Sequence, residues 1–446
     1  MRRKLLICVG AIAVFVVFVA VAGAVIFFSP LATHYLEGGA FRVAMENETA
    51  KGLHFPRSRY SSIRRTSSLT AQSESFEASN GEKALKSLQA HGITAEFDPW
   101  GVFLRQWRFN EVRVRSGETE IQIYEAKPEE TTPKPWFAIF LPSSVYLKRI
   151  EAERANVTWR LRGEQAGFFG TQLIVTPHGP DFDYTATGGE LKMAPLPDLY
   201  LRGANVLITK TRLTLYNIDL APGERSEGNI HGEGTSGIGK DRSVDFKANF
   251  ERIPIRAWLP EKWKAHLSGS AHGGIHWTGD NPKLETSSGE GSLSVRDGRA
   301  NNLPFLEKLV QLTQERSFEH LELSDCSFNF VWRYPRIEIK DIALEEKGKF
   351  RIEGTISIDR RALRGAIQLG VTRQHLAWLP DAEEIFSHQR NDYLWTTVHL
   401  SGTIDQPGQD LSPRIIELFK QSPGAYLQLL FRQFEDWLKK TFGGDQ

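Results

Sequence analysis

Cysteine is scarce in this sequence, because the 446 residues include only Cys8 and Cys326. A disulfide scaffold needs several cysteine pairs, and a zinc or iron–sulfur site built on thiolates needs three or four of these residues. Cys8 lies inside a long apolar run, which leaves Cys326 without an intrachain partner. We therefore expect Cys326 to act as a small hydrophobic residue.

An excess of charge of either sign is also absent. The 55 Lys and Arg residues nearly balance the 54 Asp and Glu residues, so the formal net charge is +1. A nucleic-acid partner bound through phosphate neutralisation requires a strong basic excess, and we predict no nucleic-acid partner. The mean hydropathy of -0.34 excludes a polytopic membrane protein.

Sequence motifs for catalysis, nucleotide binding or metal binding are absent, or the residues around them do not fit the structure that the motif requires. Gly232–Gly237 matches a dinucleotide fingerprint by letters, but Ser243–Phe250 then alternates like a strand where a helix is needed, which favours a glycine-rich hairpin loop. His266, His272 and His276 share one strand parity, but strand neighbours at i and i+4 lie about 13 Å apart, too far to grip one metal. The sequence therefore predicts no catalytic residues, no metal ligands and no cofactors, and it does not indicate an enzyme.

One apolar run stands out near the N-terminus. Leu5–Phe28 contains 24 apolar or small residues, enough to span about 36 Å as a helix and so to cross a bilayer. Arg2, Arg3 and Lys4 precede the run, which places the N-terminus in the cytoplasm and the rest of the chain on the far side. The alternative is a cleaved signal peptide, since Ala22–Ala24 fits a small-x-small cleavage site.

Most of the chain after Phe97 alternates apolar and polar residues, the pattern of half-buried strands. The clearest stretch is Phe350–Ile358, which turns at Asp359–Arg361 and returns through Leu363–Val371 as a hairpin. Turn dipeptides such as Asp297-Gly298 and Lys347-Gly348 separate the strands. We predict a mainly β fold: an N-terminal transmembrane helix, then an elongated, curved antiparallel sheet of groove-like form, with a few short helices and a C-terminal amphipathic helix.

Helices are expected at few places. Gly38-Gly39 weakens the first expected helix, Leu31–Lys51. The segment Arg57–Ser75, which follows this helix, is either a solvated loop or edge strand, or a contact to anionic lipid head groups. The C-terminal tail either caps the sheet edge or lies on a membrane. The expected helices cover Leu31–Lys51, Ala84–Ala90, Asn302–Arg316, a segment opening at Ser412-Pro413, and a tail carrying Tyr426 to Leu438.

The expected organisation follows from these segments, with the proline-rich Lys127–Pro135 as the best internal boundary. It comprises a cytoplasmic tip (1–4), a transmembrane helix (5–28), an N-terminal periplasmic region (29–135), a central β-rich region (136–288), a C-terminal region (289–407) and an amphipathic helical tail (408–446).

The C-terminal region resembles that of the AsmA-like family of bacterial envelope proteins. The resemblance rests on Gly289–Leu293 with Asp297-Gly298, Leu303–Leu306, Phe318–Leu323, Ile337–Asp341, Gly354–Ile356 and Leu400–Ile404 closed by Gln406-Pro407. It implies a bacterial inner-membrane protein with a single span, whose periplasmic β-rich part is related to bridge-like lipid-transfer proteins with an apolar concave sheet face. No catalytic residue comes with this family.

An alternating sheet must bury its apolar face against something. A second sheet would give a closed sandwich core, whereas acyl chains would fill an open groove. We expect the lipid-groove or core lining to include Ile352, Ile356, Ile358, Ile367, Leu369 and Val371, and the sequence does not separate the two outcomes. The leading hypothesis is a non-enzymatic envelope protein that binds or moves phospholipid or another acyl lipid, or supports outer-membrane assembly, with another envelope protein as a further partner. The alternative is a structural or adaptor protein with a closed β-core.

Overall fold

The structure is a computed structural model that describes residues 30–101, 106–122, 145–161, 163–179, 181–194, 196–238, 242–259, 261–280, 283–301, 319–404 and 406–421. The expected transmembrane segment, the boundary at Lys127–Pro135, the helix at Asn302–Arg316 and the tail from Tyr426 lie outside these residues. The protein is mainly β and is built on large, mostly antiparallel sheet ladders, as predicted. Two compact units divide the chain: unit 1 holds residues 1–226 and 233–242, and unit 2 holds residues 227–232 and 243–446.

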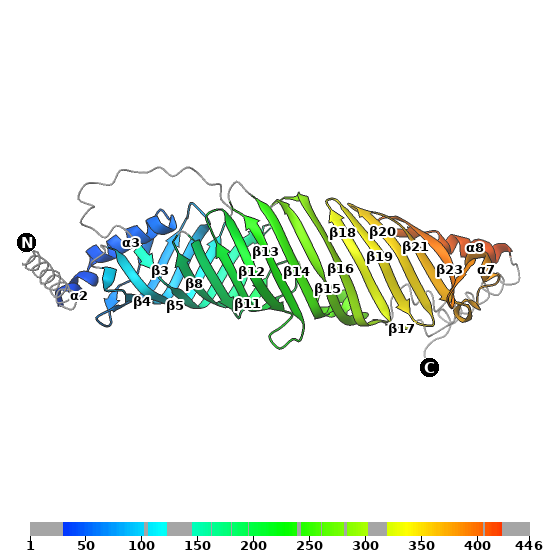
Figure 1. Ribbon diagram of the computed structural model, residues 1–446, viewed down its shortest axis with the longest axis horizontal. Helices are drawn as coiled ribbons and strands as arrows, with labels where there is room; N and C mark the ends of the chain where they lie inside the picture. The colour runs from blue at the N-terminus through cyan, green and yellow to red at the C-terminus, as the bar shows by residue number, and fades with distance from the viewer. Residues whose placement is uncertain are drawn as a thin grey trace, which may run out of the picture. The chain divides into compact units, whose positions relative to one another are not determined.

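Two helices open unit 1 (Figure 1). Helices α2 (Pro30–Leu36) and α3 (Gly39–Leu53) are separated at Glu37-Gly38, so the predicted helix forms and breaks where its glycines weaken it. Phe41 of α3, 1% exposed, packs with Phe97 and Phe109 of the sheet. In the part of the chain that the structure describes, no helix combines the length and the apolar character that crossing a bilayer requires.

The sheet of unit 1 begins with β3, which pairs with β1 and β2 on one side and with β4 on the other. Antiparallel pairing continues from β4 to β5, and then β5 pairs in parallel with β6 and β7. Antiparallel pairing resumes from β7 to β8, through β9 and β10 to β11, and on to β12. The strands are β1 (Ser58–Tyr60), β2 (Arg64–Arg65), β3 (Thr70–Ser79), β4 (Leu85–Phe97), β5 (Trp107–Ile121), β6 (Val145–Leu147), β7 (Ile150–Leu161), β8 (Glu164–His178), β9 (Asp181–Thr187), β10 (Glu190–Lys192), β11 (Leu199–Ile208) and β12 (Arg212–Ala221).

Two local predictions in this part of the chain are wrong. Ala84–Ala90 was expected to be a helix, but Leu85–Ala90 open β4, which is hydrogen-bonded to β3 and β5 along its length. A helix of seven residues is marginal by itself, and the pairing on both sides outweighs it. Gly232–Gly237, expected to be a hairpin loop, lies within β13 (Asn229–Gly237), which carries residues of both units.

Unit 2 is a second antiparallel ladder, in which β14 to β16 pair in chain order, β16 pairs with both β17 and β18, and β18 to β21 continue to β23 (Figure 1). Strands β22 and β24 both pair with the side of β23 that is opposite β21. The strands are β14 (Ser243–Pro254), β15 (Leu267–Asp280), β16 (Lys283–Asn301), β17 (His320–Leu323), β18 (Asp325–Arg333), β19 (Arg336–Glu346), β20 (Phe350–Asp359), β21 (Ala362–Thr372), β22 (His388–Arg390), β23 (Tyr393–Gly402) and β24 (Pro407–Gln409). The helices are η2 (Ile255–Ala257), α5 (Glu261–Lys264), η4 (Arg373–Leu376), α7 (Ala382–Ile385) and α8 (Leu411–Gln421).

The hairpins of unit 2 test the turn predictions. The hairpin of β20 and β21 is confirmed, with Asp359 paired to Ala362 and Arg360 in the left-handed region at φ 55°. Lys347-Gly348 is confirmed as a turn. Asp297-Gly298 is not a turn, because β16 continues through it with a register shift opposite Ser268 and Ser270. The predicted helix at Ser412-Pro413 is confirmed as α8.

Candidate functional site

One face of the unit 2 sheet is apolar from strand to strand. Because paired residues of neighbouring strands project to the same side, the registers define rows that run across the sheet. We call this surface the apolar face. Its first row is Phe246, Trp277, Gly289, Trp332, Ile337, Ile358 and Leu363, and its second row is Ala248, Ile275, Gly291, Phe330, Ile339, Ile356 and Gly365.

Two further rows complete the apolar face. The third contains Leu293 and Phe328 and continues, across a register shift between β18 and β19, with Ile342, Gly354 and Ile367. The fourth contains Leu344, Ile352 and Leu369. Strands β14 to β21 lie side by side in Figure 1. At about 4.8 Å between strands and about 6.6 Å between alternate residues, the face measures about 30 Å by 20 Å.

Burial on this face changes from one side to the other. All large side chains of the first row are half-buried, and Ile275 in the second row is 36% exposed. Beyond the fourth row, Phe350, Val371 and Leu394 are 8%, 9% and 6% exposed. The first two rows therefore still contact solvent, whereas the opposite margin is a sealed core.

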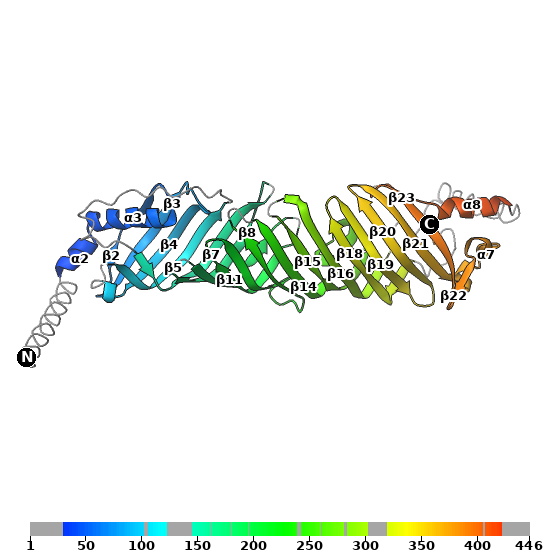
Figure 2. The same cartoon turned by 45° about the horizontal axis from the view of Figure 1, so that its top comes forward.

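A cluster of apolar side chains seals that margin. Leu376, Leu379, Ile385 and Phe386, from the segment that contains η4 and α7, pack with Phe350, Val371 and Leu394, and Leu418 of α8 joins them. Both views place α7 and α8 beside β23 (Figures 1 and 2). We call the sealed side the covered rim and the side at the first row the open rim.

The six predicted lining residues fall on this one surface, but in different surroundings. Val371 belongs to the sealed cluster, and Ile352 and Leu369 pack partly against it. Ile356, Ile358 and Ile367 are half-buried and lie in the rows toward the open rim. The structure thus brings the predicted residues together and divides them between the sealed cluster and the half-buried rows.

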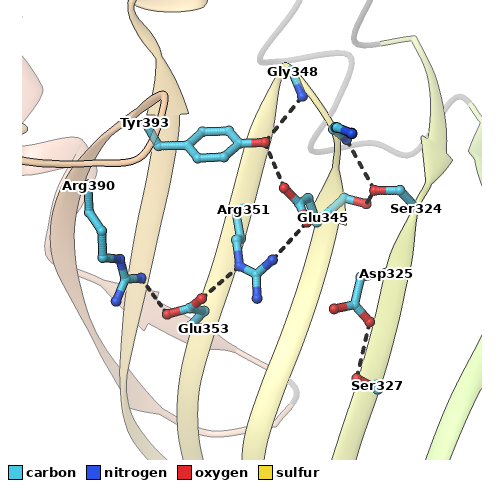
Figure 3. Close-up of polar contacts among 10 residues, drawn as sticks. Ser324, Asp325, Ser327, Glu345, Gly348, Arg351, Glu353, Arg390 and Tyr393 are labelled. Atoms are coloured by element: carbon cyan, nitrogen blue, oxygen red, sulfur yellow. Dashed lines mark hydrogen bonds and ion pairs between the residues drawn. The ribbon is translucent and has the colours of Figure 1, made fainter.

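The opposite face of the same strands is polar (Figure 3). Arg351 pairs with Glu345 at 2.8 Å and with Glu353 at 2.7 Å, and Arg390 pairs with Glu353 at 2.5 Å. Burial opposes ionisation of Glu353, but the two arginines outweigh it and lower the pKa of this carboxyl. These four charged side chains of the polar face are thus paired with one another.

Tyr393 of β23 extends this network. Its hydroxyl donates to Glu345 at 2.8 Å and accepts the Gly348 N–H at 3.2 Å (Figure 3). Burial, with the hydrogen bond to Glu345, raises the pKa of Tyr393. The contact fastens the turn between β19 and β20 to the edge of the sheet.

A second ionic cluster lies in unit 1. The carboxylate of Asp98, whose side chain is 6% exposed, lies 3.2 Å from Arg108 and 3.3 Å from Lys148 and accepts the Trp100 N–H. Desolvation opposes its ionisation, but the Trp100, Lys148 and Arg108 contacts outweigh it, so the pKa of Asp98 is lowered. The cluster ties β4 to β5 and the residue after β6.

Two of the three histidines singled out in the sequence contact polar groups of other segments. His266 precedes β15 and its Nδ1 lies 3.0 Å from the Asn301 carbonyl, while His276 Nε2 lies 2.9 Å from Asp245. The described residues contain no group of three or more His, Cys, Asp or Glu side chains placed to hold a metal. These side chains link neighbouring strands.

Sequence reasoning missed most of the apolar face. Trp332 and Ile337 share the row of Ile358, and Phe330 and Ile339 share the row of Ile356. The signal was present, since Phe328, Phe330 and Trp332 alternate as do Ile337 and Ile339, but the pairing that aligns them is not visible in one strand. Comparison of the chain with protein-family models, with curated proteins and with solved structures finds no match.

Proposed function

We propose that this protein binds acyl lipids on the apolar face of unit 2 and holds or moves them without catalysis. The observation that carries the proposal is the pair of apolar rows that cross seven strands and in which no large side chain is buried; Trp277, Trp332 and Ile356 are half-buried members of these rows. Contiguous apolar surface of this extent marks a binding site for another apolar molecule.

The energetics fit a hydrocarbon ligand. A fully buried methylene contributes roughly 0.8 kcal/mol, so a chain of about fourteen methylenes, half-buried against the sheet, gains roughly 6 kcal/mol. Two chains on one lipid would double this contribution, before the cost of ordering them. A face of about 30 Å by 20 Å has room for both.

The gradient of burial favours lipid binding over an adaptor with a closed core. A sandwich core would bury alternate residues along the whole strand. In β20, Phe350 at the covered rim is the only residue that is less than 9% exposed, whereas Ile352, Ile356 and Ile358 are half-buried.

The proposed location is a bacterial inner membrane, with Leu5–Phe28 as the single span and the two units in the periplasm. The apolar run, the basic residues before it and the resemblance of Gly289–Pro407 to the AsmA-like family support this location. We also propose that the chain belongs to the AsmA-like family and that it supports outer-membrane assembly. A reporter that is active only in the periplasm, fused after Gln446, should be active.

Lipid carriage is tested on the full chain, extracted in mild detergent and analysed by mass spectrometry. We expect phospholipid in a fixed molar ratio to protein after extensive exchange into lipid-free detergent. Protein that is folded but free of lipid, and that takes up none when phospholipid is added back, would refute the proposal.

A further inference from the structure

We infer that one corner of unit 1 docks on the surface of the bilayer and places the side chains of Trp100 and Tyr146 in the lipid–water interface. The inference rests on the proposed location, in which Leu5–Phe28 spans the membrane. We call this part of unit 1 the aromatic corner. It lies where β4 ends and where β5 and β6 begin, and it consists of Asp98, Trp100, Arg108, Tyr146 and Lys148.

Two aromatic side chains of this corner are exposed. Trp100 is 68% exposed, the largest value among the exposed large apolar side chains of the described residues, and Tyr146 is 41% exposed. Tryptophan and tyrosine are enriched where a membrane meets water, because one part of each side chain is apolar and the other can form hydrogen bonds. A lipid surface is therefore a partner that fits both rings.

Hydrogen bonds hold the backbone around Trp100 in place. The carboxylate of Asp98 accepts the Trp100 N–H at 3.1 Å, and the carbonyl of Asp98 accepts the Gly101 N–H at 3.0 Å. The Asp98 N–H donates to the Arg108 carbonyl at 2.8 Å, which joins this turn to β5. The exposed ring is thus presented from an ordered turn, and docking orders little additional backbone.

Basic side chains lie beside the two rings. The guanidinium of Arg108 lies over the Tyr146 ring, 4.4 Å from its centroid, and 3.2 Å from the Asp98 carboxylate. The Lys148 ammonium lies 3.3 Å from the same carboxylate, and its side chain is 46% exposed. Long basic side chains with their charged ends at the head groups, next to tryptophan and tyrosine rings, are typical of protein surfaces at a membrane.

The charges behind the corner do not oppose docking. Glu96 pairs by register with Glu111, and Arg113 and Arg149 lie 2.7 Å and 3.5 Å from the Glu111 carboxylate. Together with the charged residues of the corner, these side chains comprise four cations and three carboxylates, a sum of +1. Lipid head groups, whether zwitterionic or anionic, therefore meet no net repulsion here.

Contacts connect the corner to the first helix of the described chain. Helix α2 begins two residues after Phe28, and Arg65 of β2 donates to the Thr33 hydroxyl of this helix at 3.0 Å; Figure 2 shows α2 beside β2. The turn after β2 reaches the end of β4, where the Phe97 N–H donates to the Leu69 carbonyl at 2.7 Å. Thr33 can lie at most about 18 Å from Phe28. The proposed span would thus hold this side of unit 1 close to the bilayer.

The test uses the full chain in bilayer discs of phosphatidylcholine and phosphatidylglycerol. Cys8 and Cys326 are replaced by alanine, and a spin label is attached at Pro99→Cys, an exposed position next to Trp100. Collisions with oxygen, which dissolves preferentially in lipid, and with a water-soluble nickel chelate report where the label lies. We expect the label at position 99 to collide mainly with oxygen. A label at Tyr216→Cys, which replaces a 56% exposed residue of β12 in the same unit, should collide mainly with the chelate.

Removal of the two rings tests whether they cause the docking. Trp100→Ala/Tyr146→Ala should lower the ratio of docked to undocked corner by at least about tenfold, because each ring would lose roughly 100 Å² of apolar contact with lipid. The label at position 99 should then collide mainly with the chelate. Tyr216→Ala is the matched control and should leave the label in lipid. Both variants change exposed side chains and should unfold within about 4 °C of the wild type.

Two results would overturn the inference while the proposed span stands. One is a label at position 99 that collides mainly with the chelate although the chain is inserted in the discs. The other is lipid contact that Trp100→Ala/Tyr146→Ala leaves unchanged, because the span alone would then hold the corner at the bilayer. A chain that does not stay in the discs would refute the proposed span and the inference together. Lipid binding by unit 2 is measured separately, by mass spectrometry of the bound lipid, and does not depend on this outcome.

Discussion

Substitution of Ile356 by lysine distinguishes an apolar face that contacts solvent from a closed core. Ile356 lies between Ile339 and Gly365 in the second row and is half-buried. A lysine there loses about 1 kcal/mol of apolar burial, but its stem can follow the surface and its ammonium can reach solvent. We therefore expect a free energy of unfolding lower by about 1–2 kcal/mol and a Tm lower by about 2–8 °C.

The same lysine in a sealed core would behave differently. An unpaired buried charge costs more than about 4 kcal/mol, a large fraction of the usual stability of about 5–15 kcal/mol. Circular dichroism during heating measures this difference. Failure of Ile356→Lys to fold would contradict the exposed face.

Lipid carriage is the second readout of this variant. An ammonium among the acyl chains, with the loss of one isoleucine contact, should lower the bound lipid about tenfold. Thr355→Lys is the matched control, because Thr355 is exposed and projects from the opposite face of the same strand. Equal lipid content in the two variants would refute the assignment of the apolar face.

Three further predictions concern stability. Gly291→Ala should destabilise the protein by about 1–3 kcal/mol, because a Cβ atom at this position would lie 2.2 Å from a backbone oxygen. Gly289→Ala is the control and should be tolerated, because the atoms nearest to its Cβ would lie at 3.4 Å. Similar urea unfolding midpoints for the two variants would contradict this packing. Tyr393→Phe removes the hydrogen bond to Glu345 and should cost about 1.5–3 kcal/mol in urea unfolding; a loss below about 0.5 kcal/mol would show that the contact is not stabilising. Asp98 has a lowered pKa in the folded state, so its stabilisation is present above about pH 4, the pKa of an unfolded aspartate, and disappears as the pH falls through the folded-state pKa. Asp98→Asn should therefore lower Tm at pH 7 and approach the wild type in acid, and a Tm difference independent of pH would refute the ionic explanation.

Alternation along a strand predicted the fold class, because period two reports which side of a strand is apolar whatever its partner. The hairpin of β20 and β21 could be predicted for the same reason, since its turn and both strands are contiguous in the sequence. The strand at Ala84–Ala90 could not be predicted, because the pairing of β4 with β3 and β5 overrides a weak local helix preference. Asp297-Gly298 shows the same limit: the pair suits a turn, but it also suits a bulge, and only the partner strand decides.

The candidate site was predictable in its residue type but not in its extent. The six predicted residues come from one hairpin, whereas the rows join side chains from β14 to β21. The cover provided by Leu376, Leu379 and Phe386 comes from a short irregular segment with no period to recognise. Because the sequence does not show which strand positions this segment covers, it does not reveal that Val371 is sealed and Ile358 is not.

The difference between Val371 and Ile358 is the structural basis of the function that we propose for unit 2. Both project from the same face of one hairpin, yet the helical segments that seal the covered rim reach only one of them. Sealing one margin stabilises the sheet, since it buries Phe350 and Leu394 away from water. Ile358 at the opposite margin lies outside that sealed cluster, and it is at this margin that we propose that acyl lipid binds.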